Sequence, residues 1–258
     1  MKYSNRIYLI GGILLAALSL MSCGRQVRII TTTSEKVTVK RAISPFDKIE
    51  ISGSPNVVYE QGDSCTVTVK GPKELVDDIV TEMNGNTLMV RNKGKIGMFN
   101  IELSDDEGLV VYVTSPDLIG VQLSGSGGFV CKNRIDTDYI NVTLRGSGDI
   151  DIHDLICDHC ITELTGSGDL DIDRLEAKIS EVTLIGSGDI DLKQYNVEQT
   201  DIILKGSGDI AIDFNDGCVR SDAKLQGSGD IKLKGKLKKF NGTKTGSGSI
   251  DTGKLIVP

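Results

Sequence analysis

The chain has 258 residues, a formal net charge of −7, 39% hydrophobic residues, 4% aromatic residues and no tryptophan. That length is sufficient for one sizeable folded domain. An acidic chain without a basic stripe does not match a nucleic-acid surface, so we expect no nucleic-acid partner.

Residues 1–22 predict a lipoprotein signal peptide. Lys2 and Arg6 supply a positive amino-terminal region, and an apolar run follows over residues 7–20. The segment ends in Leu-Met-Ser-Cys23, which resembles the bacterial lipobox, where cleavage precedes a cysteine that becomes acylated. We therefore expect lipidation at Cys23 and a membrane as partner through the lipid anchor. The alternative is a plain signal peptide or signal anchor with an incidental cysteine.

The residues after Cys23 bear on localisation. Position 24 is glycine and not the aspartate that retains enterobacterial lipoproteins at the inner membrane, which favours the outer membrane. The next residues lack the acidic cluster of a surface-export tag, so the cell surface and the periplasmic face both stay open. Residues 23–43 are interpreted as a lipidated tether that leads into the folded domain.

The predicted domain spans residues 44–258, and its first part, residues 44–120, is irregular. Residues 49–54 resemble one more Gly-Ser corner, and two later segments, 65–70 and 109–114, alternate as β-strands do. Residues 72–80 predict a short helix with Pro72 at its first position. Asn84-Gly85 is typical of a tight hairpin turn, and residues 92–108 predict a polar excursion. An irregular part of this kind is suited to capping the end of a repeat structure.

Residues 121–258 repeat a Gly-Ser-Gly triplet. The steps between successive triplets are 21, 20, 20, 20, 21 and 19 residues. The triplets begin at Gly125, Gly146, Gly166, Gly186, Gly206, Gly227 and Gly246. Such a period indicates a solenoid, in which each repeat is one rung that buries its apolar face against its neighbours.

The arms on both sides of each triplet alternate with period two. Val142 and Leu144 precede one triplet, and Ile150 and Ile152 follow it. The glycines permit a tight corner between two sheets. Stacking pairs each arm with its counterpart one repeat away, in parallel and about 4.8 Å distant. The sequence thus predicts an all-β fold, a single-stranded parallel β-helix with two-sheet rungs, and right-handed winding is favoured.

Several of these segments carry a family resemblance. They are Ile-Glu-Ile-Ser-Gly-Ser from residue 49, Val-Tyr-Glu-Gln-Gly-Asp from 58, Asn-Thr-Leu-Met-Val from 86 and the serial Gly-Ser-Gly-Asp-Ile/Leu-Asp motif. Over about residues 44–250 the chain resembles the auto-transporter adhesin "head GIN" domain family, a domain of unknown function widespread in Bacteroidetes. The resemblance implies a Gly-Ser-Gly-cornered superhelix and an adhesive or envelope-surface role. It implies no catalytic residues.

One Cys/His cluster could form a metal site: His153, Cys157, His159 and Cys160. The repeat register argues against it. Cys157 occupies the same repeat position as Ala177 and Val197, so it is a core position, where a free cysteine behaves as a small hydrophobe. Cys160 is placed likewise, and Cys131 takes the inward position of Ile152. We expect no metal site here, and either one disulfide involving Cys157 and Cys160 or none.

An aspartate follows most triplets, and stacking would place these carboxylates about 5 Å apart. The ladder is Asp149, Asp169, Asp189, Asp209 and Asp230, with Asp151, Asp171 and Asp191 in a second column. The structural interpretation is that each carboxylate accepts backbone N–H groups at its own corner, as aspartate does in turns. The alternative is Ca²⁺ bridging neighbouring carboxylates, with Asp149, Asp169, Asp189 and Asp209 as ligands; otherwise we expect no cofactor.

These observations predict a non-enzymatic, lipid-anchored envelope protein, an adhesin or binding scaffold with a glycan or protein ligand. The alternative is a structural or signalling-accessory lipoprotein that faces the periplasm. A β-helical polysaccharide-active enzyme is disfavoured, because such enzymes need two acids in different environments and every rung offers the same ones. Sugar-stacking aromatic residues are also scarce. An open last rung would suit a partner or a second copy of this chain.

Overall fold

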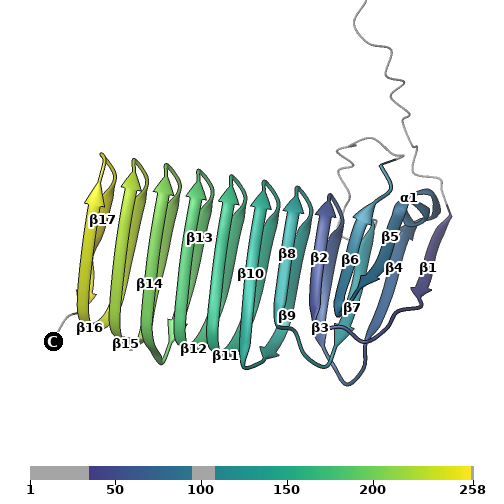
Figure 1. Cartoon of the computed structure of the whole chain (residues 1–258), viewed down its shortest axis with the longest axis horizontal. Helices are drawn as coiled ribbons and strands as arrows, with labels where there is room; N and C mark the ends of the chain where they lie inside the picture. The colour runs from purple at the N-terminus through teal and green to yellow at the C-terminus, as the bar shows by residue number, and fades with distance from the viewer. Residues whose placement is uncertain (1–34, 95–107, 257–258) are drawn as a thin grey trace, which may run out of the picture. The chain divides into compact units, whose positions relative to one another are not determined.

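The computed structural model describes residues 35–94 and 108–256, and these residues form a β-solenoid of about 7 turns (Figure 1). The predicted all-β fold with stacked rungs is therefore confirmed. The signal peptide, Cys23, most of the tether and most of the polar excursion lie outside the described residues. No helix among the described residues is long and apolar enough to cross a membrane.

The elements of the first part are β1 (Lys36–Arg41), β2 (Lys48–Gly53), β3 (Asn56–Gln61), β4 (Thr66–Pro72), α1 (Lys73–Asp78), β5 (Ile79–Asn84), β6 (Thr87–Asn92) and β7 (Val110–Ser115). The elements of the repeat part are β8 (Gly120–Gly125), β9 (Gly128–Asp136), β10 (Tyr139–Gly146), β11 (Asp149–Gly166), β12 (Asp169–Gly186), β13 (Asp189–Tyr195), β14 (Val197–Gly206), β15 (Asp209–Gly227), β16 (Asp230–Thr245) and β17 (Ser249–Ile256).

Each rung has a leading arm that enters the Gly-Ser-Gly corner and a trailing arm that leaves it. All arms of the repeat part pair in parallel with their counterparts in the next rung. The first glycine of one triplet lies opposite the first glycine of the next, as Gly166 does opposite Gly186. The triplets therefore form one column along the stack, which is the arrangement that the period predicts.

The stacked corners are held by backbone contacts. In the rung that contains Gly186, the N–H groups of Ser187 and Gly188 both donate to the carbonyl oxygen of Gly166 in the rung before, at 2.8 and 3.2 Å. Gly186 has φ +139°, in a region that disfavours side chains. A Cβ on Gly188 would lie 2.1 Å from the Gly168 carbonyl oxygen. The glycines are thus required by the close approach of one corner to the next as well as by the turn.

The interior is a continuous apolar core, built from the inward-facing residues of both arms. The predicted columns are found: Cys131 lies opposite Ile152, and Cys157 lies opposite Ala177. One inward column departs from this chemistry, because Gln194 stands between Leu175 and Phe214. Its side chain is 1% exposed, donates to the Ser180 hydroxyl at 2.9 Å and accepts from the Thr200 hydroxyl at 2.7 Å.

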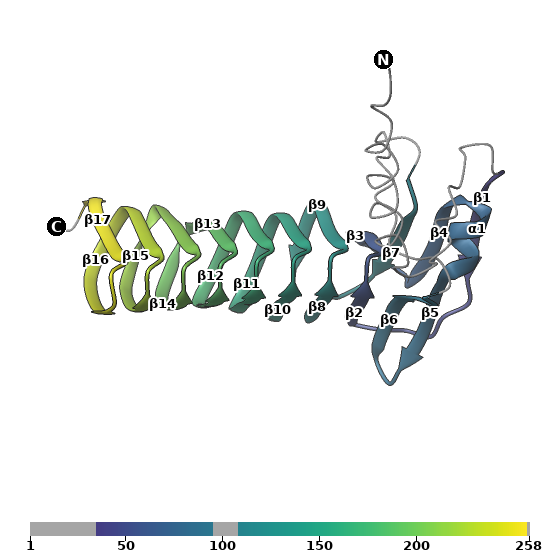
Figure 2. The same ribbon diagram turned by 90° about the horizontal axis from the view of Figure 1, so that it is seen from above.

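The order of rungs in the stack differs from their order in the chain at the amino-terminal end (Figure 2). The β2–β3 rung lies between β6–β7 and β8–β9, and Gly53 pairs with Gly125. Beyond it, β4 and β5 run antiparallel to their neighbours, and β1 pairs antiparallel with β4. The predicted Asn84-Gly85 hairpin and the short helix are both present, although the helix is shorter than predicted and begins after Pro72.

Candidate binding surface

The trailing arms of consecutive rungs present outward-facing charged side chains in register. One column consists of Asp151, Asp171 and Asp191, which lie opposite one another across β11, β12 and β13. The corner aspartates Asp149, Asp169 and Asp189 form a parallel column two residues earlier. We call these six residues the acidic strip. All six are exposed.

Beside the acidic strip, opposite charges pair across rungs. The Lys193 ammonium lies 2.6 Å from the Asp173 carboxylate, and His153 Nδ1 lies 3.3 Å from the same carboxylate. Further from the corner, Asp154 contacts both Arg134 at 2.8 Å and Arg174 at 3.2 Å. Positive charge on this face is thus largely matched by carboxylates of neighbouring rungs.

The column of Asp151, Asp171 and Asp191 has no ion-pair or hydrogen-bond partner among the described residues. Although the Asp171 side chain is exposed, partial desolvation by its surroundings raises its pKa, and the neighbouring carboxylates of Asp191 and Asp151 raise it further. A surface depression of about 280 Å³ lies over these three residues, Asp173 and Lys193. This unmatched negative charge is available to a cationic group of a partner.

We expect Asp171→Asn to stabilise the protein at neutral pH. A raised folded-state pKa means that the ionised carboxylate is less stable in the folded protein than in the unfolded chain. The destabilisation is present above the unfolded pKa and disappears as the pH falls below it. The group is partly solvated, so the gain should be roughly 0.5 kcal/mol or less. Denaturant midpoints measured between pH 3 and 7 check this.

Asp173→Asn is the matched control, because it should act in the opposite direction. Hydrogen bonds from Lys193 and His153 lower the pKa of Asp173. Its ionised form therefore contributes stability above the unfolded pKa, and that contribution is lost as the pH falls through the folded pKa. If both variants change stability in the same direction at pH 7, the carboxylates do not have the surroundings described here.

Three of the corner aspartates, Asp189, Asp209 and Asp230, have a structural role, but it differs from the one expected. The Asp189 carboxylate accepts the backbone N–H of Asp209 in the next rung at 3.0 Å, and the Asp209 carboxylate accepts that of Asp230 at 3.0 Å. These hydrogen bonds join successive rungs. The sequence had predicted that each carboxylate would instead accept backbone N–H groups of its own corner. In the described part of the chain no group of three or more acidic, His or Cys side chains is arranged to hold a metal ion. Ca²⁺ binding at Asp149, Asp169, Asp189 and Asp209 therefore stays a prediction without a formed cage.

The side chains of the four Cys/His candidates do not point to a common metal site. Cys157 and Cys160 are buried in the core, and the neighbouring Cys160 thiol together with burial raises the pKa of Cys157. His153 and His159 point outward and contact Asp173 and Glu181. All five cysteines of the described residues are free. The core interpretation of Cys157 and Cys160 matches this placement.

Sequence reasoning missed two features of the site. It treated the aspartates of successive rungs as equivalent. In the structure, the column that contains Asp173 forms ion pairs with neighbouring rungs, whereas the column that contains Asp171 forms none. It also missed Gln194, because a polar residue type normally indicates an outward-facing position. The alternation itself was the available signal: Gln194 is two residues after inward-facing Leu192.

The fold and the charged columns together define a class of protein, a β-solenoid that presents repeated charged side chains on its sheet faces. Comparison with known families identifies one family. Residues 45–217 and 178–258 match the family described as "Putative auto-transporter adhesin, head GIN domain", and the chain belongs to that family.

Solved structures share the fold. A "putative adhesin" from Bacteroides fragilis NCTC 9343 is 24% identical with a TM-score of 0.71, covering 87% of this chain and 99% of that one. A "putative adhesin" from Parabacteroides distasonis ATCC 8503 is 19% identical with a TM-score of 0.70, covering 87% and 98%. A "putative lipid binding protein" from the same species is 22% identical with a TM-score of 0.66, covering 87% and 98%. At these identities the likeness shows the fold alone. No protein of curated function matches the chain.

Proposed function

We propose that this protein is a lipid-anchored component of the outer membrane that binds a partner through the acidic strip and catalyses no reaction. The family supports an adhesin or binding role at the cell envelope. The observation that carries the proposal is the unpaired column of Asp151, Asp171 and Asp191, repeated once per rung on a sheet face. Equal spacing suits a partner that itself repeats, such as a glycan or a protein surface with regularly placed cationic or hydroxyl groups.

Binding is tested with the mature chain on a glycan array and on intact cells of other species, with Ca²⁺ and with a chelator. The test variant combines Asp151→Asn, Asp171→Asn and Asp191→Asn. The control variant removes the same charge elsewhere, through Asp63→Asn, Glu74→Gln and Glu163→Gln. We expect the first variant to lose binding at least about ten-fold, at roughly 0.5–1 kcal/mol for each charge, while the control keeps it. Equal loss in both variants would mean that only net charge matters.

Anchoring and orientation need a separate experiment. We expect Cys23→Ser to abolish incorporation of a labelled fatty acid and to move the protein from the membrane fraction to the soluble fraction. Protease treatment of intact cells then distinguishes the adhesin from the alternative, a periplasm-facing structural or signalling-accessory lipoprotein. Cleavage without cell lysis supports surface display, and protection until lysis supports the periplasmic alternative.

A further inference from the structure

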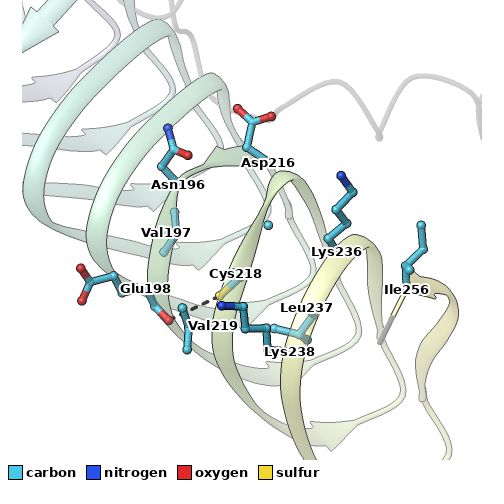
Figure 3. A pocket seen from close by; sticks show the side chains of 11 residues that line it. Asn196, Val197, Glu198, Asp216, Cys218, Val219, Lys236, Leu237, Lys238 and Ile256 are labelled. Carbon is cyan, nitrogen blue, oxygen red and sulfur yellow. Dashed lines mark hydrogen bonds between the residues drawn. The ribbon is translucent and has the colours of Figure 1, made fainter. Parts of the chain in front are cut away.

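A groove of about 390 Å³ lies at the corner opposite the Gly-Ser-Gly column, across the last rungs (Figure 3). Buried Val197, Cys218 and Leu237 are part of its lining. Val219 and Ile256 lie at its edges and are 48% and 62% exposed, the two highest values among the exposed large aliphatic side chains of residues 35–94 and 108–256. The volume is within the range of small-ligand sites, about 300–1,000 Å³.

The groove exists because the rungs change their geometry at this corner. The register of β15 against β16 shifts between Phe214 and Cys218, and Gly217 adopts φ +106°. One rung earlier, Asn196 adopts φ +55° and ends the trailing arm. The rungs of β11 and β12 pass this corner without a shift of register, as Cys157 does opposite Ala177. Next to the irregular corner at Gly217, the side chain of Val219 faces solvent, and so does that of Ile256 in the last rung.

The sign of the net charge also changes along the sequence in the rungs that form the groove. Residues 223–256 carry eight lysines and two acidic residues, whereas the rungs before them are strongly acidic. Lys232 and Lys234 pair with Asp209 and Asp213 of the preceding rung. Lys236 and Lys238 line the groove, and their ammonium groups make no ion pair or hydrogen bond within the described residues. Lys236 lies opposite Ile256 in the strand register, so unpaired positive charge adjoins the exposed apolar edge.

The other rim carries Glu198 and Asp216. Positive and negative rims therefore lie on different rungs, with the apolar lining between them. A ligand with one anionic end is attracted by the lysines and repelled by the carboxylates, so it has one preferred orientation. An apolar tail can then lie along the exposed side chains of Val219 and Ile256, above buried Leu237, which removes the two exposed surfaces from water.

We propose that this groove binds an anionic amphiphile, a molecule with one acyl chain and a phosphate or carboxylate headgroup. The acyl chain of this ligand lies on the apolar lining, and its headgroup contacts the ammonium groups of Lys236 and Lys238. This site is separate from the acidic strip and goes beyond the binding role proposed above. Either proposal can fail without the other.

The test uses calorimetric titration of the mature chain with Cys23→Ser, so that no attached lipid competes. The probes are octyl, decyl and dodecyl phosphate at monomeric concentrations, and free inorganic phosphate. Each added pair of methylenes should tighten binding about ten-fold, at roughly 0.8 kcal/mol per buried methylene. Dodecyl phosphate should bind at least ten-fold more tightly than dodecyltrimethylammonium or dodecyl maltoside, and inorganic phosphate should not bind measurably. Equal affinity for the three dodecyl headgroups, or no dependence on chain length, would overturn the proposal.

Two variants with matched controls locate the site. Lys236→Glu with Lys238→Glu should weaken dodecyl phosphate binding at least about ten-fold, whereas Lys224→Glu with Lys205→Glu should not. Val219→Ser with Ile256→Ser should weaken it several-fold, whereas Ile185→Ser, an exposed apolar residue on another rung, should not. All substitutions are at exposed positions, and unchanged thermal unfolding confirms the fold. If the groove variants bind as the unsubstituted protein does, the amphiphile binds elsewhere and the proposal is wrong.

Discussion

Gly188→Ala should lower the free energy of unfolding by about 3 kcal/mol or more. The added methyl carbon would lie 2.1 Å from the Gly168 carbonyl oxygen, a backbone atom of the neighbouring rung. Because backbone cannot rotate aside as a side chain does, the two rungs must separate. Separation also weakens the N–H bond from Gly188 to the Gly166 carbonyl. Denaturant unfolding followed by circular dichroism measures the change in midpoint.

Two other glycines separate the contact from the backbone conformation. Gly85→Ala changes a residue at φ +60° with open space around its Cβ position, so it should cost about 1 kcal/mol through conformation alone. Gly62→Ala has neither constraint and should leave the midpoint within about 0.5 kcal/mol. If Gly188→Ala behaves as Gly62→Ala does, the corners are not stacked in contact and the fold described here is wrong.

Gln194→Leu should destabilise the protein by about 2–4 kcal/mol even though it makes the core more apolar. The side chain of Gln194 accepts from Thr200 and donates to Ser180, and all three residues are buried. Leucine would leave the buried Ser180 hydroxyl without its side-chain partner and would leave the Thr200 hydroxyl only a weak contact with the Cys218 thiol at 3.8 Å, and both losses carry a desolvation cost. The same denaturant experiment measures the loss.

Removing the hydroxyl groups as well should reverse the effect. The triple variant Gln194→Leu, Ser180→Ala, Thr200→Val leaves no polar group of this network unsatisfied, so its stability should return to within about 1 kcal/mol of the original. Gln226→Leu, at an exposed position of β15, controls for the substitution itself and should have little effect. A triple variant as unstable as Gln194→Leu would show that packing, and not hydrogen bonding, sets the cost.

Both experiments depend on neighbouring rungs staying in fixed register, and so does the proposed binding surface. The column of Asp151, Asp171 and Asp191 has a constant spacing only while the backbone of each rung contacts the next. A corner substitution that separates two rungs should therefore also disturb binding across that point. The groove begins at Asn196, in the same rung as Asp191, and ends at Ile256 three rungs further along, so its Ile256 end should be less affected, since each rung contacts only its neighbours.

The amino-acid sequence by itself determined the repeat, the rung and the corner. The interval between triplets sets the rung length, and alternation in Val142, Leu144, Ile150 and Ile152 sets which side chains face inward. These features are local and periodic, so each can be inferred from a few adjacent residues. The same periodicity correctly placed Cys157 and Cys160 in the core.

Only the tertiary structure decided how rungs distant in sequence are combined. It placed the β2–β3 rung beside β8–β9, although the chain between them forms β4 to β7. It joined Gln194 to hydroxyls on the opposite sheet, and it left Asp171 unpaired while Asp173 found Lys193. The physical reason is that pairing energies depend on which side chains face each other across a rung or across the core. A one-residue change of register at an irregular corner alters those neighbours and leaves the alternation of the sequence unchanged.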